Sequence, residues 1–219
     1  TLKEVNDAVM GGYWRNYGSR GLFTGGHTPS LVNTIDYVTI ATTGDTADFG
    51  DLTSAREAVA GVSSFIRSIT LGGGEPGSVN KMEYVTFSSL GNAADFGNLT
   101  ESVQYPGGAS NSVRGIRMGG ATPTRVNVID YFTMASTGNA TDFGNLSAAK
   151  QEPGTFASPT RAITGGGFTG SYINVIEYVE IATTGNAIDF GDLTQTFGAQ
   201  ANSNNCSSTR GIFAGGYEA

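Results

Sequence analysis

Short apolar runs of strand length alternate with glycine-rich and polar turns along the chain, and one stretch shows this pattern clearly. The runs are rich in β-branched and aromatic residues, which favour strands. Val113–Met118 ends on the diglycine Gly119-Gly120, which is typical of a strand entering a turn that needs positive φ or a close backbone approach. The predicted strands of this stretch are 102–110, 113–118, 126–134 and 141–146. Together they predict a four-stranded antiparallel meander.

The same pattern returns along the chain at a fixed period. The tripeptide Asp-Phe-Gly begins at Asp48, Asp95, Asp142 and Asp189, in steps of 47 residues. Diglycines and tyrosines keep the same phase, at Gly25, Gly72, Gly119 and Gly166 and at Tyr37, Tyr84, Tyr131 and Tyr178. A strict period of this length indicates an array of one supersecondary unit. Residues present in every copy are expected to hold the unit together, so specific activity is to be sought where the copies differ.

The repeat predicts an all-β chain that forms a single repeat domain over residues 1–219. The copies span approximately 4–52, 53–99, 100–146 and 147–193, with a partial copy at 194–219. A four-stranded unit repeated every 40 to 50 residues is typical of a β-propeller blade. We therefore expect about five blades, the last of them incomplete in this chain. A β-solenoid is the competing architecture, although its coils usually repeat at shorter periods.

The unit resembles the Kelch repeat in three features. A diglycine follows the second strand, a tyrosine stands in the third strand, and an aromatic residue stands in the fourth. Kelch units carry tryptophan at that last place, whereas this chain has phenylalanine, at Phe49, Phe96, Phe143 and Phe190. The resemblance implies a Kelch-like propeller, with membership in the family loosened by this departure.

A closer resemblance covers nearly the whole chain. The segment Asn127–Tyr131, together with the stretch Thr137–Leu146, resembles repeats in uncharacterised structural proteins of marine tailed bacteriophages. That resemblance implies a component of the virion or of an appendage such as a tail fibre. It also implies other virion or appendage subunits as partners, and a virion or extracellular location.

The two ends of the array are out of balance. The phase gives five first and second strands but only four third and fourth strands, because the chain ends soon after the diglycine Gly215-Gly216. The fifth blade is then half-built, completed by a neighbouring chain in a homo-oligomer, or completed by further sequence. We favour the last two, because an exposed strand edge at Ile212 and Phe213 would invite pairing.

Composition excludes several partners. The net charge is −7, which does not attract nucleic acid or an anionic membrane surface. No apolar run approaches the length needed to span a bilayer, so membrane insertion is not expected. Cys206 is the single cysteine, so an intrachain disulfide is not possible.

The sequence carries no recognisable catalytic set. His27 is the only histidine, and no cluster of carboxylates specific to one copy stands near it or Cys206. Four evenly spaced Asp-Phe-Gly copies without a nucleotide-binding loop are not a kinase magnesium segment. In each copy phenylalanine is expected to fill the space between blades, aspartate to cap a turn and glycine to permit the bend. We therefore predict no enzymatic activity, no metal site and no cofactor.

Arginine and an acid recur in fixed places of the unit. The arginines are Arg20, Arg67, Arg114, Arg161 and Arg210, and the acids are Asp36, Glu83, Asp130 and Glu177. The pattern predicts structural ion pairs between the two series, or arginine hydrogen bonds to main-chain carbonyls. A ring of arginines that binds an anion in the channel is the alternative.

The turns between second and third strands differ from copy to copy, and such turns on one face of a rigid ring are the usual place for binding residues. The candidate ligand-binding residues there are His27, Arg125, Phe168 and Tyr172. Trp14, the only tryptophan, stands in an irregular segment and is a candidate docking point for a neighbouring chain. The favoured hypothesis is a structural and adhesive propeller that binds a host-surface glycan through these turns. The alternative is a general protein-interaction module, and a propeller enzyme ranks last.

Overall fold

The computed structural model describes residues 20–198, 206–207 and 209–217, and within them every regular element is a β-strand paired antiparallel with its neighbours. The expected all-β class is confirmed. Sheet 1 contains β1 (Arg20–His27), β2 (Leu31–Thr39) and β3 (Ala47–Asp51). Sheet 2 contains β4 (Ala60–Ser63), β5 (Arg67–Leu71), β6 (Gly74–Glu75), β7 (Gly77–Thr86) and β8 (Ala94–Val103).

Two further sheets follow in chain order. Sheet 3 contains β9 (Gly107–Ser110), β10 (Arg114–Met118), β13 (Val128–Thr133) and β14 (Thr141–Asn145), and the short pair β11 (Ala121–Thr122) and β12 (Thr124–Arg125) forms the turn between β10 and β13. Sheet 4 contains β15 (Gly154–Ala157), β16 (Arg161–Gly165), β17 (Val175–Glu180) and β18 (Ile188–Asp192). The first strand of the third copy is shorter than expected, because the residues up to Val103 extend β8 of the sheet before it.

The strand pairing repeats with the sequence period. Strands β1, β5, β10 and β16 hold the same place in the sequence repeat, and each opens on an arginine. The partners of these arginines in the next strand of the repeat are Arg20↔Thr39, Arg67↔Thr86, Arg114↔Thr133 and Arg161↔Glu180. Each third strand pairs with its fourth strand through a shift in register, and three of these shifts lie at Ile35/Asp36, Ile129/Asp130 and Ile176/Glu177. Such a bulge bends the strand and increases its twist. The repeat therefore governs backbone geometry as well as sequence.

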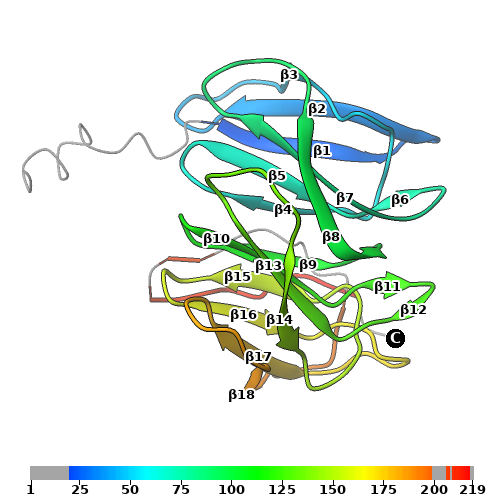
Figure 1. Cartoon of the computed structure of the whole chain (residues 1–219), viewed down its shortest axis with the longest axis vertical. Helices are drawn as coiled ribbons and strands as arrows, with labels where there is room; N and C mark the ends of the chain where they lie inside the picture. Colours follow the sequence, from blue (N-terminus) through cyan, green and yellow to red (C-terminus); the bar gives the residue numbers. More distant parts are fainter. Residues whose placement is uncertain (1–19, 199–205, 208, 218–219) are drawn as a thin grey trace, which may run out of the picture.

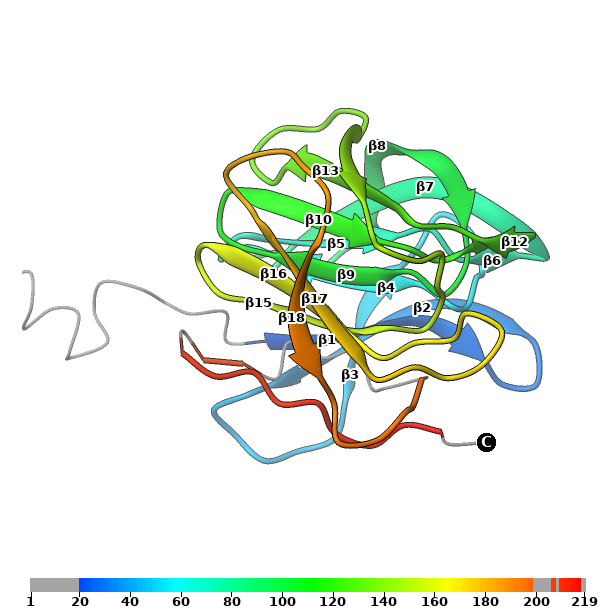
Figure 2. The ribbon, with the colours of Figure 1, turned by 90° about the horizontal axis from the view of Figure 1, so that it is seen from below.

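The sheets follow one another along the molecule in chain order, from sheet 1 at the top of Figure 1 to sheet 4 at the bottom. The first strands of sheets 2, 3 and 4, which are β4, β9 and β15, lie side by side (Figure 2), and β9 contacts both of the others. The links that lead into these strands are also joined: Tyr105 N–H donates to the Ala58 carbonyl and Glu152 N–H to the Tyr105 carbonyl, each at 2.9 Å. These three residues all have positive φ.

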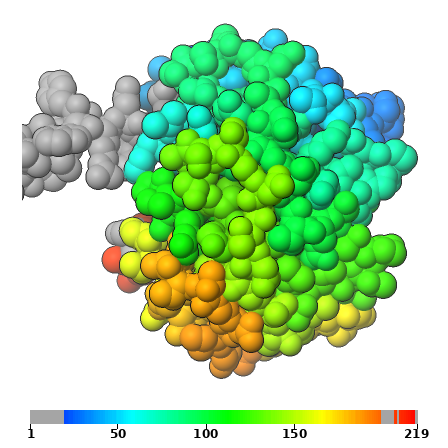
Figure 3. Space-filling view, in the orientation of Figure 1, coloured from blue at the N-terminus to red at the C-terminus, as the bar shows by residue number. Residues whose placement is uncertain are grey.

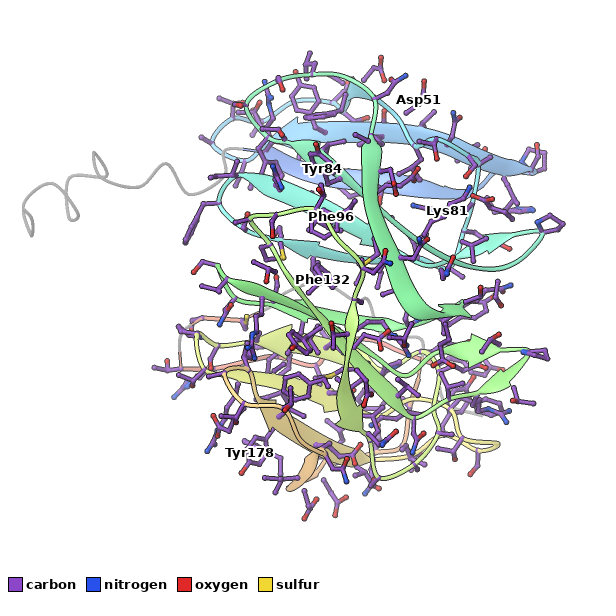
Figure 4. All side chains as sticks on the ribbon, viewed as in Figure 1. Asp51, Lys81, Tyr84, Phe96, Phe132 and Tyr178 are labelled. Carbon is purple, nitrogen blue, oxygen red and sulfur yellow. The ribbon has the colours of Figure 1, made fainter. Side chains whose placement is uncertain are left out.

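The apolar core lies between consecutive sheets as three separate clusters. The cluster between sheets 2 and 3 includes Phe96 of β8 and Phe132 of β13, with Tyr84 packed against it (Figure 4). The clusters between sheets 1 and 2 and between sheets 3 and 4 contain the equivalent phenylalanine and leucine, Phe49 with Leu52 and Phe143 with Leu146. Each sheet is thus stabilised mainly by what covers its face in the next copy.

In the part of the chain that the structure describes, no helix has the length and apolarity needed to cross a membrane.

Candidate functional site

The Asp-Phe-Gly tripeptide forms the joint between one sheet and the next. Phe49, Phe96 and Phe143 are only 2–3% exposed, and each meets the tyrosine of its own third strand edge-on at 5.8–6.0 Å. Asp48 and Asp95 each accept, at Oδ1, a hydrogen bond of 3.1 Å from the N–H of the glycine two residues later. The motif is structural at these three positions.

The glycine of the motif is required by the approach of the next sheet. A Cβ atom on Gly97 would lie 2.3 Å from the carbonyl oxygen of Gly138, and one on Gly144 would lie 2.3 Å from that of Gly185. Both glycines also have positive φ. The neighbouring backbone comes this close because Gly185 N–H donates to the Phe143 carbonyl at 2.8 Å.

Each junction has three such hydrogen bonds between a fourth strand and the loop of the following sheet. Between sheets 3 and 4, Gly185 N–H bonds to Phe143 O, Ala187 N–H bonds to Asn145 O at 2.8 Å, and Asn145 N–H bonds to the Asn186 side chain at 3.0 Å. The same three recur between sheets 1 and 2 and between sheets 2 and 3. The edge strand of one sheet is thus paired by the Gly-Asn-Ala loop of the next.

The repeated arginines reinforce the same junctions. The guanidinium of Arg114 stacks on the Tyr131 ring of its own sheet at 4.7 Å and donates to the Ile181 carbonyl of the next sheet at 2.7 Å. Arg67 and Arg20 repeat this arrangement with Ala135 O and Phe87 O. The predicted bond to a main-chain carbonyl is thus observed for Arg20, Arg67 and Arg114, whereas Arg161 forms an ion pair with Glu180.

The predicted pairing of the arginine series with the acidic series is wrong, because the acids bind other cations. Glu83 pairs with Arg56 at 2.6 Å, Asp130 with Arg117 at 2.5 Å and Glu177 with Lys150 at 3.0 Å. Arg56 and Lys150 hold equivalent positions of the repeat, and Val103 stands at that position in the copy between them. There Arg117 on β10 supplies the positive charge that pairs with Asp130. All three ion pairs are buried.

The buried acids also bridge consecutive sheets. Glu177 of sheet 4 accepts a hydrogen bond from the N–H of Ser147, which follows β14 of sheet 3, at 2.8 Å. Burial alone would raise the pKa of Glu177, but Lys150 and Ser147 outweigh it and hold the pKa below its ordinary value. Burial lowers the pKa of Lys150, and Glu177 only partly offsets this. Removing one partner would therefore leave a buried charge uncompensated.

The variable turns bring three of the predicted binding residues into one row. The Arg125 guanidinium lies over the Phe168 ring at 4.5 Å, Phe168 meets Tyr172 at 5.1 Å, and Tyr172 meets Tyr217 at 5.7 Å. We call Arg125, Phe168, Tyr172 and Tyr217 the aromatic row. It crosses from sheet 3 over sheet 4 to the last described segment. Tyr217 is 61% exposed, so the row ends at the surface.

The local backbone explains why the row forms here. Phe168 bridges both Gln151 and Tyr172, which fixes the turn against the link between sheets 3 and 4. Tyr172 packs over Gly198, where an added Cβ would lie 2.6 Å from its ring. Desolvation, the nearby Glu152 carboxylate and Tyr217 raise the pKa of the Tyr172 hydroxyl above its ordinary value.

The other predicted site residues do not join the row. His27 is exposed at the end of β1, where it pairs with Leu31, and makes no ring contact within the described ranges. Trp14 lies outside the described residues. Arg210 is exposed and lines a different feature, described next. Sequence reasoning missed Tyr217, although it follows Gly215-Gly216 at the same offset at which Phe168 follows Gly166-Gly167.

A cavity of about 490 Å³ lies between the face of sheet 4 and the segment that contains residues 206–207 and 209–217. Its walls include Ile163, Ile176 and Phe190 of sheet 4 and Phe213 of the last segment. Phe213 packs on Phe156 at 4.8 Å. Arg161 and Arg210 border the cavity, together with the hydroxyl side chains of Ser158, Ser207 and Thr209.

Across residues 20–198, 206–207 and 209–217, no group of three or more metal-ligating side chains comes together. Comparison with models of protein families gave no match, and comparison with curated proteins gave none either.

Proposed function

We propose that the chain is part of a Kelch-like β-propeller whose function is structural and adhesive, not catalytic. Three observations support this architecture: the repeated registers, the first strands lying side by side, and the joined links at Ala58, Tyr105 and Glu152. In this proposal the four sheets are successive blades, and the last described segment begins a fifth.

The proposed ligand is a host-surface glycan, bound along the aromatic row. The proposal rests on the aromatic row because the copies of the repeat differ there. The position of Tyr172 is held by Leu31, Ser78 and Arg125 in the other copies. Aromatic faces pack against the apolar face of a sugar ring, while tyrosine hydroxyls and the Glu152 carboxylate are suited to bind sugar hydroxyls. The role as a virion or appendage component, with other virion subunits as partners, rests on the resemblance to phage repeats.

A glycan array with three proteins tests this proposal. The unmodified chain is expected to bind a defined set of glycans, and Tyr172→Ala is expected to lose that binding by about tenfold or more. His27→Ala is the matched control, since it alters the equivalent class of turn on sheet 1 away from the row. Equal losses for both variants would place the site elsewhere, and an array without any binding would contradict a glycan ligand.

The same row also favours one alternative. Tyrosine and arginine are the residue types enriched at protein-interface hot spots, and here they form a continuous strip. A blank array combined with capture of a protein partner that Tyr172→Ala abolishes would establish the interaction-module alternative.

A further inference from the structure

Sheet 4 presents on its outer face the same residues that the other sheets bury. Phe190 of β18 is 53% exposed, whereas its counterparts Phe49, Phe96 and Phe143 are 2–3% exposed. Ile163 and Ile176 are only half-buried, while Ile116 and Ile129 at the same positions of sheet 3 are fully buried. Figure 3 shows the residues around β18, in orange, at the lower edge of the molecule.

The edge of β18 also keeps the hydrogen-bonding geometry of a junction. Gly191 has φ 135°, close to φ 148° at Gly144. A Cβ on Gly191, however, would meet nothing within 4 Å, whereas one on Gly144 would meet the Gly185 carbonyl at 2.3 Å. Among the described residues Arg161 has no bond to a carbonyl of a following segment such as Arg114 makes. It pairs instead with Glu180 at 2.7 Å, where both side chains are over 40% exposed.

The cavity on this face defines the size and chemistry of what fits it. Ile116, Ile129 and Phe143 form the wall that receives Val179 and Ile181 of the following sheet. Their counterparts Ile163, Ile176 and Phe190 line the cavity. Arg161, the counterpart of Arg114, borders it as well.

We propose that this face is a docking site for a β-hairpin of the repeat's own third-and-fourth-strand type. The hairpin's third strand adds to the edge at Ile212, which is exposed, and its valine enters the cavity between Phe190 and Phe213. Its Gly-Asn-Ala loop pairs with the backbone of β18, as the loop at Gly185 pairs with β14. The hairpin is chosen as the occupant because hairpins of this type already pair with the preceding sheet at the three junctions inside the molecule. The docking proposal is independent of the proposed glycan binding.

Binding of a synthetic hairpin tests the docking site directly. The probe is a labelled peptide of residues 173–193, whose Val179 and Ile181 already pack on an equivalent wall, titrated with the full chain and followed by fluorescence anisotropy. We expect saturable one-to-one binding. Gly191→Ala in the chain is expected to weaken binding about tenfold or more, because its Cβ occupies the place of the docked carbonyl. A peptide carrying Val179→Lys is the matched control on the other partner.

A second experiment attaches the hairpin to the chain, so that the result does not depend on whether a free peptide folds. A copy of residues 171–193 appended after Ala219 is expected to raise Tm by about 5 °C or more and to bury Phe190. Gly191→Ala in the extended chain is expected to cancel that rise. Failure of both arms, or binding that Gly191→Ala leaves unchanged, overturns the proposal. Self-association of the chain that Phe190→Asp abolishes, without hairpin binding, overturns it in favour of a second copy as the occupant.

Discussion

Sheets 3 and 4 carry nearly the same residues in the same register, yet these residues have different surroundings. Phe143 is buried and Phe190 is 53% exposed, and Arg114 reaches a carbonyl of the next sheet while Arg161 pairs with Glu180 on its own sheet. The strand and its tyrosine contact persist in both, since Tyr178 still meets Phe190 at 6.0 Å. The difference teaches that the motif shapes a strand by itself but contributes most of its stability only when another sheet covers it.

The largest expected effect separates the two sheets through one glycine in each. Gly144→Ala is expected to cost about 4 kcal/mol or more, because the Cβ would collide with the Gly185 carbonyl. Gly191→Ala is expected to cost only about 1–3 kcal/mol, from its positive φ. Urea unfolding of both variants measures the difference. Similar losses would show that backbone conformation, not the junction, requires the glycine.

The phenylalanines provide the next contrast. Phe143→Ala is expected to destabilise the chain by about 3–5 kcal/mol, since it leaves a cavity between sheets 3 and 4. Phe190→Ala removes an exposed ring and is expected to cost less than about 1 kcal/mol. Thermal unfolding of the pair checks this, and a large loss for Phe190→Ala would mean that its face is covered in solution.

The buried ion pair between Lys150 and Glu177 lies at the junction of sheets 3 and 4. Lys150→Met is expected to cost about 3 kcal/mol, because it leaves the Glu177 carboxylate buried without a partner. The double variant Lys150→Met/Glu177→Gln is expected to recover most of that loss. Chemical unfolding at neutral pH measures both, and a double variant no more stable than the single one would contradict this view of the pair.

The pH dependence follows from the same pair. The pKa of Glu177 lies below its ordinary value in the folded chain, so its contribution is complete above the ordinary glutamate pKa of about 4.3. That contribution is lost as pH falls through the lower folded pKa. Unfolding free energies between pH 6 and pH 3 should therefore decline less in the double variant than in the unmodified chain, and parallel declines would assign the acid sensitivity to other groups.

The smallest expected effect concerns the arginines. Arg114→Leu removes a cation–π contact and a bond to Ile181 and is expected to cost about 1–2 kcal/mol. Arg161→Leu removes a solvent-exposed pair as well as its contact with Tyr178, and is expected to cost less. Calorimetric melting temperatures of the two variants test the order. If Arg114→Leu weakened the proposed glycan binding but left Tm nearly unchanged, the structural role of the series would be wrong.

The sequence predicted features that lie within one unit and missed those that depend on the next. The strands at Arg114–Met118 and Val128–Thr133, and the buried phenylalanines, follow from local periodicity and composition. The partner of Arg114 is 67 residues away, so no local pattern shows it. The pair between Arg117 and Asp130 was not predicted, because Val103 stands at the position of Lys150 and only the folded chain places Arg117 beside the acid. The aromatic row forms only where the turns of sheets 3 and 4 and the last described segment lie side by side.

Amide hydrogen exchange by NMR compares the two situations within one molecule. The N–H groups of Asp51, Asn98 and Asn145 each bond to an asparagine side chain of the next sheet at 3.0 Å, and we predict slow exchange for all three. The N–H of Asp192 holds the same position in β18, and the described residues offer it no such partner, so we predict exchange near the rate of an unprotected amide. Equal protection of Asp192 and Asn145 would contradict the claim that β18, unlike β3, β8 and β14, forms no such junction with the described residues.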